Sequence, residues 1–451
     1  MSEPNLHGIR SFGIEKLFGN RNVFIPFDNN LKVLIGENGL GKTSILNALY
    51  YTLTCKFSKL NAIVFDKIIL EFTSGDIIEI QKDDLLLSED EERLKLRHES
   101  RIGEYLMQLM TDEQKQIITE NITSDDFKSK RIVNDIVSGF QKQIGYPPQI
   151  IRRALFIMFS GRAGKLEEIK TKITKELKAE ILYFPTYRRI EEELHKLGST
   201  EEIKLPQDDK RLIQFGMEDV NSTFTKVIET IRTSAILGFS AITGEMLSQY
   251  LEGTPHLDHN IKEQIKPDVL KIVLERVGEN ITSFNKGRIM QLVSSNEIFE
   301  NDDYRYLVNF LSKLVKIYDQ QKGMDNSIKN FESICNGYLR DKKVVYNESK
   351  VTINVIQEKN QQPIQLRHLS SGEKQIISLF ARIFLDSAEN IFVLFDEPEL
   401  SLSIEWQKRL LPDILKSNKC NLLFSVTHSP FIFDNELDTY AEDMDKYVTE
   451  I

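Results

Sequence analysis

The sequence predicts an α/β protein in which a mixed sheet carries a glycine-rich loop and a large helical insertion splits the sheet-forming parts. Three observations support this fold class. An apolar run at 31–35 leads into the glycine-rich segment Gly36–Thr43, and a helical pattern follows. A second apolar run, Ile391–Phe395, ends in two acidic residues. Between these parts, from 84 to 342, apolar residues recur with the helical period and strand signals nearly vanish.

Length and composition predict several domains and a reducing compartment in which the cysteines stay as free thiols. A chain of 451 residues is too long for one ordinary core. We expect an N-terminal lobe over 1–83, a mainly helical insertion over 84–342 and a C-terminal lobe over 343–451. The three cysteines lie far apart, and neither a signal pattern nor a membrane-length apolar run is present, so a cytoplasmic protein without membrane contact is expected. A net charge of −10 argues against a wholly basic nucleic-acid binder but allows a local basic surface.

The two lobes are predicted to hold short antiparallel strands. Alternating apolar residues predict a strand pair at 9–27, joined by a turn at Phe18–Arg21, and a second pair at 63–81. A hairpin is predicted at 344–357, where strand signals return. If the segment Gly36–Thr43 binds a nucleotide, a glutamine would be expected to sense it, and Gln81, Gln141 and Gln143 are all possible candidates.

The insertion is predicted to be a compact domain of short helices, interrupted by Gly and Pro. The clearest helical patterns lie at Glu167–Ala179, Val269–Val277 and Leu307–Tyr338. One extended segment, 181–191, contains Arg188 and Arg189. These arginines either bring positive charge to a phosphate or begin a helix with Arg–Glu pairs.

The segment Gly36–Thr43 matches G-x-x-x-x-G-K-[ST] without a gap and lies between a strand and a helix. Glycines let backbone N–H groups close around a polyphosphate, and the positive end of the following helix points at the same anion. Lys42 is expected to reach the β- and γ-phosphates, and the Thr43 hydroxyl to bind Mg²⁺. The predicted ATP-binding residues here are Gly36, Glu37, Asn38, Gly39, Leu40, Gly41, Lys42, Thr43 and Ser44.

The C-terminal lobe carries three further polar segments. Ser370, Ser371 and Gly372 open a helix and form a second anion-binding element, although a simple helix cap would have the same sequence. Asp396 and Glu397 follow a buried strand, at the edge where parallel α/β sheets bind ligands.

We expect Asp396 to bind Mg²⁺ and Glu397 to orient or deprotonate the attacking water. His428 follows the next buried strand, and from there it would reach a γ-phosphate. Glu397 and His428 are the predicted catalytic residues.

Together these segments resemble the ABC-type ATPases, and within them the RecF, SMC and OLD branch rather than transport cassettes. The matching pieces are Gly36–Thr43 (Walker A), Leu369–Gln375 (signature), Phe392–Pro398 (Walker B) and His428 (switch histidine). The resemblance covers residues 5–82 and 343–432. It implies that two heads enclose two ATP molecules in a head-to-head dimer, and that the signature serine of one chain completes the site of the other.

The likeness is greatest to stand-alone ATPases of anti-phage systems, such as PtuA of Septu or the PARIS ATPase. It implies an ATP- and Mg²⁺-dependent ATPase that scaffolds or regulates a separate effector nuclease. Relatives of OLD often carry a nuclease domain, but the 23 residues after His428 are too few to hold one, so a partner subunit is expected to cut nucleic acid. Ser403 and Ile404 stand where many relatives have His-Pro, in the loop that in those relatives contacts the partner chain.

The alternative is a RecF-like ATPase of DNA repair, acting as a clamp on DNA. This reading needs a basic groove, because phosphate contacts dominate DNA affinity. The candidate residues for DNA contact are Lys128, Lys130, Arg131, Arg152, Arg153, Arg162 and Lys165, although solvated helix faces would explain them equally well.

Overall fold

The computed structural model describes residues 8–37, 39–85, 102–103, 105–121, 131–160, 162–185, 217–253, 255, 257, 260–278 and 281–451. Asn38, Lys128, Lys130, Arg188 and Arg189 lie outside these ranges. The chain divides into two units. Unit 1 comprises Met1–Leu212, Asn390–Leu400 and Cys420–Ile451, and unit 2 comprises Ile213–Glu389 and Ser401–Lys419. The boundaries at 83/84 and 342/343 remain a sequence-based prediction.

One sheet of unit 1 pairs the strands β12–β2–β1–β4–β5, with antiparallel neighbours. Its strands are β1 (Ile9–Leu17), β2 (Arg21–Pro26), β4 (Lys67–Phe72), β5 (Ile77–Gln81) and β12 (Val448–Glu450). Buried residues alternate along β4 and β5, as expected for a sheet with one face in the core. Both predicted strand pairs are present, but β4 begins at Lys67 rather than at Ile63.

The second sheet of unit 1 is parallel, in the order β11–β3–β10–β9–β6. Its strands are β3 (Leu31–Ile35), β6 (Glu180–Phe184), β9 (Ile391–Asp396), β10 (Cys420–Thr427) and β11 (Ala441–Asp443). Every residue of β9 is buried, which matches its unbroken apolar run. The predicted mixed α/β fold class is confirmed, because unit 1 combines antiparallel and parallel strands with helices.

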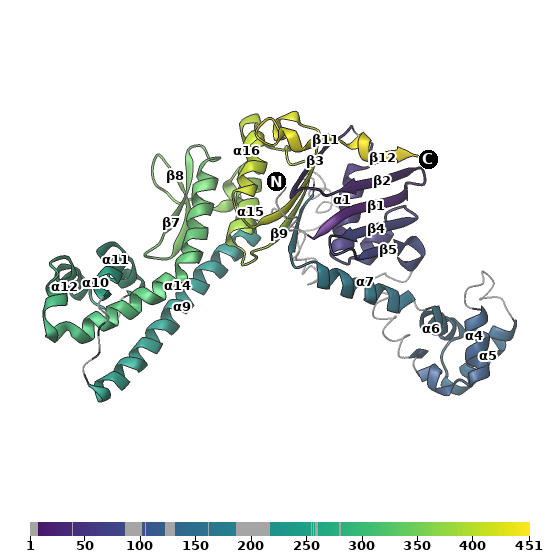
Figure 1. Ribbon diagram of the computed structural model, residues 1–451, viewed down its shortest axis with the longest axis horizontal. Helices are drawn as coiled ribbons and strands as arrows, with labels where there is room; N and C mark the ends of the chain where they lie inside the picture. The colour runs from purple at the N-terminus through teal and green to yellow at the C-terminus, as the bar shows by residue number, and fades with distance from the viewer. Residues whose placement is uncertain are drawn as a thin grey trace. The chain divides into compact units, whose positions relative to one another are not determined.

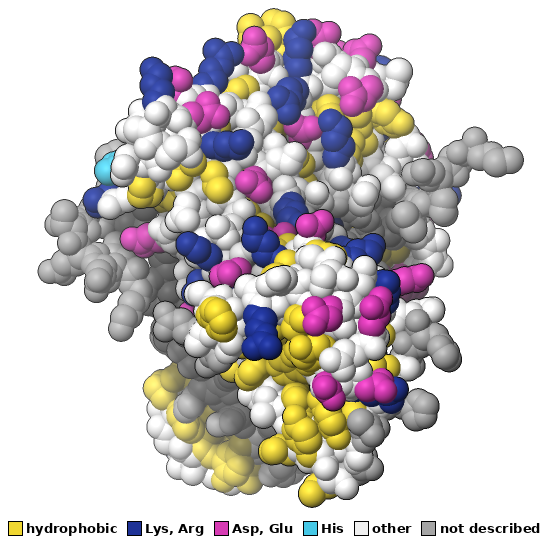
Figure 2. Space-filling view, turned by 90° about the vertical axis from the view of Figure 1, so that its left-hand side faces the viewer, with side chains coloured by type: hydrophobic (Ala, Val, Ile, Leu, Met, Phe, Trp, Pro, Cys, Tyr) yellow, Lys and Arg dark blue, Asp and Glu magenta, His cyan; other side chains and the backbone are white. Residues whose placement is uncertain are grey.

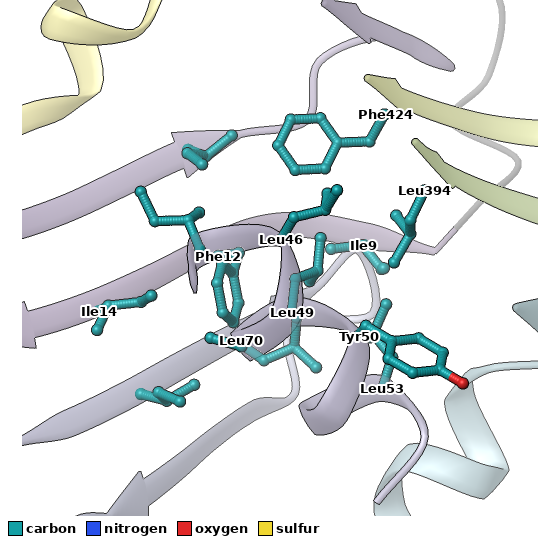
Figure 3. Packing of buried hydrophobic residues seen from close by; sticks show 14 of the residues in the cluster. Ile9, Phe12, Ile14, Leu46, Leu49, Tyr50, Leu53, Leu70, Leu394 and Phe424 are labelled. Carbon is teal, nitrogen blue, oxygen red and sulfur yellow. The ribbon is translucent and has the colours of Figure 1, made fainter. Parts of the chain in front are cut away.

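Helix α1 (Lys42–Leu53) joins the two sheets in one hydrophobic core. Figure 3 shows Leu46 and Leu49 of α1 among Phe12 of β1, Leu394 of β9 and Phe424 of β10. All five side chains are at most 1% exposed. The core therefore fixes the start of α1 relative to both sheets.

The other helices of unit 1 include a group with a hydrophobic cluster of its own. This cluster draws on α4 (Asp112–Asn121), α5 (Arg131–Ile144) and α6 (Pro148–Ser160), whereas α2 (Phe57–Asn61) and α7 (Arg162–Glu176) pack on the main core. The predicted helix at 167–179 corresponds to α7. Gln81 ends β5, and Gln141 and Gln143 lie on α5.

Unit 2 is built on two long helices, α9 (Met217–Glu252) and α14 (Arg305–Asn336), which run antiparallel and side by side (Figure 1). They contain 36 and 32 residues, so the prediction of short helices is wrong. A glycine within a helix is tolerated when it serves packing. A Cβ built at Gly238 would lie 2.5 Å from Cδ1 of Ile317, so this glycine lets α9 approach α14 closely.

The rest of unit 2 packs around these helices. It contains α10 (Ile261–Gln264), α11 (Pro267–Arg276), α12 (Ser283–Ser294), α13 (Glu297–Glu300), α15 (Ser371–Phe380), a π-helical turn (Ala381–Leu385), α16 (Ile404–Leu415) and the hairpin β7 (Lys342–Asn347)–β8 (Thr352–Gln357). The hairpin prediction at 344–357 is confirmed. No helix among the described residues is long and apolar enough to span a membrane.

A buried ion pair connects three elements of unit 2. Nη2 of Arg276 on α11 lies 2.6 Å from Oδ1 of Asp325 on α14, and these side chains are 5% and 0% exposed. Arg276 also donates to Gln321, at 2.8 Å, and the Tyr346 hydroxyl of β7 donates to Asp325. Neither charge could be removed alone without leaving the other uncompensated in the interior.

Candidate nucleotide-binding site

Three parallel strands of unit 1 end at the same edge of the sheet. Thr427 of β10 is in register with Ile35 of β3, and Val426 is in register with Asp396 of β9. The residues that follow the three strands are therefore neighbours. They are Gly36 of the glycine-rich loop, Glu397 of the acidic pair and His428. This edge is where parallel α/β sheets bind ligands.

The loop after β3 turns directly into α1, as its sequence predicts. Gly41 is the N-cap of α1 and has a left-handed backbone with φ +84°, which favours glycine. A Cβ built there would lie 2.9 Å from Cε2 of the half-exposed Phe18, whose ring would have to shift, so the backbone angle is the main reason for a glycine here. Lys42 is the first residue of the helix, and the partly exposed Thr43 and Ser44 complete its first turn.

The side chain of Lys42 folds back into the loop and is only 5% exposed. Its ammonium donates to the carbonyl oxygens of Gly36, at 2.6 Å, and Glu37, at 2.9 Å. It also lies 2.5 Å from Nε2 of His428. Burial lowers the pKa of Lys42, although the carboxylates of Glu397 and Asp396 act in the opposite direction. The structure thus brings together the lysine and the histidine that the sequence separates by 386 positions.

The acidic pair lies beside this lysine. Asp396 ends β9 and is 1% exposed. Glu397 has a left-handed backbone, with φ +49°, and its N–H donates to Val426 O at 2.9 Å. Its Oε1 lies 3.5 Å from Nε2 of His428. Burial raises the pKa of Glu397, and the nearby negative charges of Asp396 and Glu399 raise it further.

Glu399 has a structural role in the site that the sequence reasoning missed. One carboxylate oxygen accepts hydrogen bonds from the N–H groups of His428, at 2.8 Å, and Ser429, at 3.1 Å. The other accepts from the Thr427 hydroxyl at 2.8 Å. Glu399 therefore fixes the turn that carries His428. The third acidic residue of Asp-Glu-Pro-Glu is the sequence feature that could have pointed to this role. Its partners lie almost thirty positions away, so the sequence alone does not identify them.

The turn between β1 and β2 contributes two more contacts that were not predicted. Nη1 of Arg21 donates to the carbonyl of Gly39 at 2.9 Å. Phe18 is 48% exposed, and its ring lies against Gly41 as described above. The sequence predicts only a turn for this segment, whereas in the structure it contacts the glycine-rich loop at Gly39 and Gly41.

The second predicted anion-binding element belongs to unit 2. Ser370 is the N-cap of α15, and Ser371 and Gly372 are its first two helical residues. The Ser370 hydroxyl accepts from the N–H of Glu373, and the Glu373 carboxylate accepts from the N–H of Ser370. This reciprocal pair is a capping box. Ser403, one of the two residues that replace the His-Pro of many relatives, is the N-cap of α16.

The basic residues proposed for DNA contact are partly engaged within the fold. Lys165 lies 2.6 Å from Asp84, and Arg152 donates to Asn134 at 2.6 Å. Lys128 and Lys130 lie outside the described residues, as do the side chains of Arg131, Arg153 and Arg162. The extended segment at 181–191 is present as β6 up to Phe184 and as Pro185 after it, whereas Arg188 and Arg189 lie outside the described residues.

A glycine-rich loop between a buried parallel strand and a helix, with a carboxylate pair at the same sheet edge one strand beyond the central β10, defines a phosphate-binding-loop nucleotide protein. Comparison with known families agrees. The sequence matches the AAA ATPase domain family over residues 14–433, and the chain belongs to this family. It is an ATPase, and it binds ATP.

Similar solved structures include two Smc head domains. One is bound to the C-winged helix domain of ScpA; it shares 11% identity, with 94% of this chain and 90% of that chain covered and a TM-score of 0.31. The other, derived from Pyrococcus furiosus, has an extended coiled coil and is bound to the C-terminal domain of ScpA. It shares 12% identity, with 94% and 91% covered and a TM-score of 0.33. No curated protein matches the sequence.

Proposed function

We propose that this ATPase is of the ABC type, in the RecF, SMC and OLD branch, and that ATP drives its head-to-head dimerisation. In this proposal it scaffolds or regulates a separate effector nuclease in anti-phage defence. The observation that carries the ATP chemistry is the convergence of Lys42, Glu397 and His428 at one sheet edge. Dimerisation and the effector are proposed from the resemblance of the four sequence motifs.

The residues of unit 1 have distinct roles in this chemistry. Lys42 would exchange its bonds to the loop carbonyls for β- and γ-phosphate oxygens. The Thr43 hydroxyl and the Asp396 carboxylate supply the hard oxygen donors that Mg²⁺ prefers, and the ion when bound would neutralise charge on the phosphates. Glu397 would accept a proton from the attacking water, and its raised pKa suits a general base. His428 would donate a hydrogen bond to the γ-phosphate.

In the dimer, the Ser370–Gly372 end of α15 from one chain would meet the γ-phosphate held by the other. Free N–H groups at a helix N-terminus and the positive end of the helix dipole favour such an anion. α15 has ten residues, and its serine cap keeps this end ordered. Hydrolysis would then require two chains, and Ser370→Arg should block it while leaving ATP binding intact.

The DNA-clamp alternative has less support from the described residues. Lys165 and Arg152 are held by Asp84 and Asn134. The face shown in Figure 2 carries Lys and Arg side chains interspersed with Asp and Glu, so this one face offers no continuous basic surface. DNA affinity depends on counterion release from many phosphate contacts, which a surface of mixed charge supplies poorly.

The deciding experiment is the native mass of the chain co-expressed with its genomic neighbours, with and without ATP. A stable complex that contains a nuclease supports the proposal and identifies the effector. The Lys42→Ala variant is the control, because it should not respond to ATP. A monomer that pairs only when ATP and DNA are both present would overturn the scaffold proposal in favour of the clamp.

A further inference from the structure

We propose that Lys342 is a positioning residue for the anion-binding end of α15, and thereby for hydrolysis in the partner chain. The inference rests on the proposed role of Ser370–Gly372 in a head-to-head dimer. It assigns a function to a residue outside all four motifs. Lys342 is the first residue of β7, and α15 begins almost thirty positions later.

The contact runs through the carboxylate of Glu373, whose side chain is only 8% exposed. Nζ of Lys342 lies 2.8 Å from both carboxylate oxygens of Glu373. One of these oxygens also accepts from the N–H of Ser370, at 2.8 Å, and from its hydroxyl, at 2.9 Å. Lys342 therefore holds the carboxylate that in turn holds the serine.

The charge of Lys342 matters as much as its position. Burial alone would raise the pKa of Glu373, but hydrogen bonds from Lys342 and Ser370 outweigh it and leave the pKa below its ordinary value. Glu373 is therefore ionised, in the first turn of the helix end proposed to meet a γ-phosphate. An uncompensated carboxylate there would repel the phosphate. The ammonium of Lys342 offsets this repulsion.

The strand that carries Lys342 is anchored to unit 2 close to this residue. Two residues further along β7, Val344 exchanges two hydrogen bonds with the side chain of Asn336, the last residue of α14. The Val344 N–H donates to Oδ1 at 2.7 Å, and Nδ2 donates to the Val344 carbonyl at 2.8 Å. The start of β7 is thus fixed to the end of a long helix. Lys343 is exposed and offers a matched control of the same residue type.

The test compares Lys342→Met, Lys342→Arg and Lys343→Met in ATP binding and in steady-state hydrolysis. Lys342→Met should bind ATP normally, because the ATP-binding loop lies in unit 1, yet its kcat should fall at least about tenfold. Lys342→Arg keeps the charge and should recover most of the rate. Lys343→Met should match the wild type. A wild-type kcat for Lys342→Met would overturn the inference.

Mixing inactive chains separates positioning from misfolding. An equal mixture of Lys342→Met and Glu397→Gln, which should still bind ATP and dimerise, contains dimers in which the first chain supplies an intact catalytic glutamate and the second an intact α15. Half of the dimers are mixed and each has one complete site, so about a quarter of wild-type activity should return. The reference mixture is Ser370→Arg with Glu397→Gln.

Each outcome of the mixing experiment has a distinct meaning. If the reference mixture recovers activity and the Lys342→Met mixture does not, the loss in Lys342→Met is structural and the inference fails while the dimer stands. If neither mixture recovers, the head-to-head dimer itself is wrong, and the inference falls with it. Recovery in both supports the assignment of Lys342.

Discussion

Replacing Glu399 by Ala tests whether the turn that carries His428 is held by a single carboxylate. The substitution removes three hydrogen bonds, from the N–H groups of His428 and Ser429 and from the hydroxyl of Thr427. Hydrogen bonds to a charged acceptor contribute about 1.5–3 kcal/mol each when they are not replaced. Water can reach this edge, since the His428 side chain is 31% exposed, and will replace part of them. We therefore expect a loss of about 2–3 kcal/mol in unfolding free energy.

The effect on catalysis should exceed the effect on binding. Released from Glu399, His428 can shift relative to Lys42 and Glu397, and a displacement of about 1 Å in a catalytic group lowers a rate by roughly 100-fold. The loop and Lys42 are not altered, so the ATP dissociation constant should stay within about threefold of wild type. The measurements are kcat from phosphate release and Kd from titration with an ATP analogue.

Two further variants make this result decisive. Glu399→Gln keeps one acceptor oxygen for the two backbone N–H groups and should lose only about tenfold in kcat. Glu436→Ala removes an exposed glutamate from the segment after His428 and should behave as wild type. If Glu399→Ala folds normally and its kcat stays within twofold of wild type, the turn is held by something other than Glu399, and the reasoning is refuted.

Three more predictions concern the site and unit 2. Glu397→Gln should bind ATP but hydrolyse it at least about 100-fold more slowly. In the wild type, burial and neighbouring carboxylates raise the pKa of Glu397. Wild-type kcat should therefore fall on acidification at a higher pH than it would with an ordinary carboxylate as the base. Gly41→Ala should weaken ATP binding about tenfold, measured by titration, because the left-handed backbone costs about 1–2 kcal/mol. Arg276→Met should lower the unfolding free energy by about 3–5 kcal/mol in urea, because it leaves Asp325 buried without its partner.

Each of these three has an internal control. Glu399→Gln removes a negative charge near Glu397, so the acid limb of the kcat–pH profile should move to lower pH. An unchanged acid limb would show that Glu397 is not the group whose titration controls kcat. Gly75→Ala also places alanine at a left-handed position, far from the loop, and should leave ATP affinity intact. Arg340→Ala breaks the exposed ion pair with Glu405 and should cost less than about 1 kcal/mol, so equal losses for both arginines would refute the buried-pair argument.

The ATP-binding loop could be predicted from sequence because its information is local. The run from β3 through Gly36–Thr43 into α1 contains the strand, the turn glycines and the helix within about twenty residues. The same holds for β9 with its acidic pair, whose unbroken apolar run predicts burial. The prediction of short helices failed for the opposite reason, because a glycine inside a long helix can serve a distant contact. Gly238 serves a contact with Ile317, almost eighty positions away, and local propensity cannot reveal it.

The sequence by itself therefore determined the class of chemistry: a phosphate loop, a carboxylate pair, a candidate histidine and a second helix N-terminus, each written in a short segment. Only the tertiary structure decided how they combine. The register of β10 between β3 and β9 brings His428 to Lys42 and brings Glu399 to the turn that carries His428. The β7–β8 hairpin brings Lys342 to Glu373. These pairings depend on which strands are neighbours and in which register, and that is set by long-range packing, which no single segment of the chain encodes.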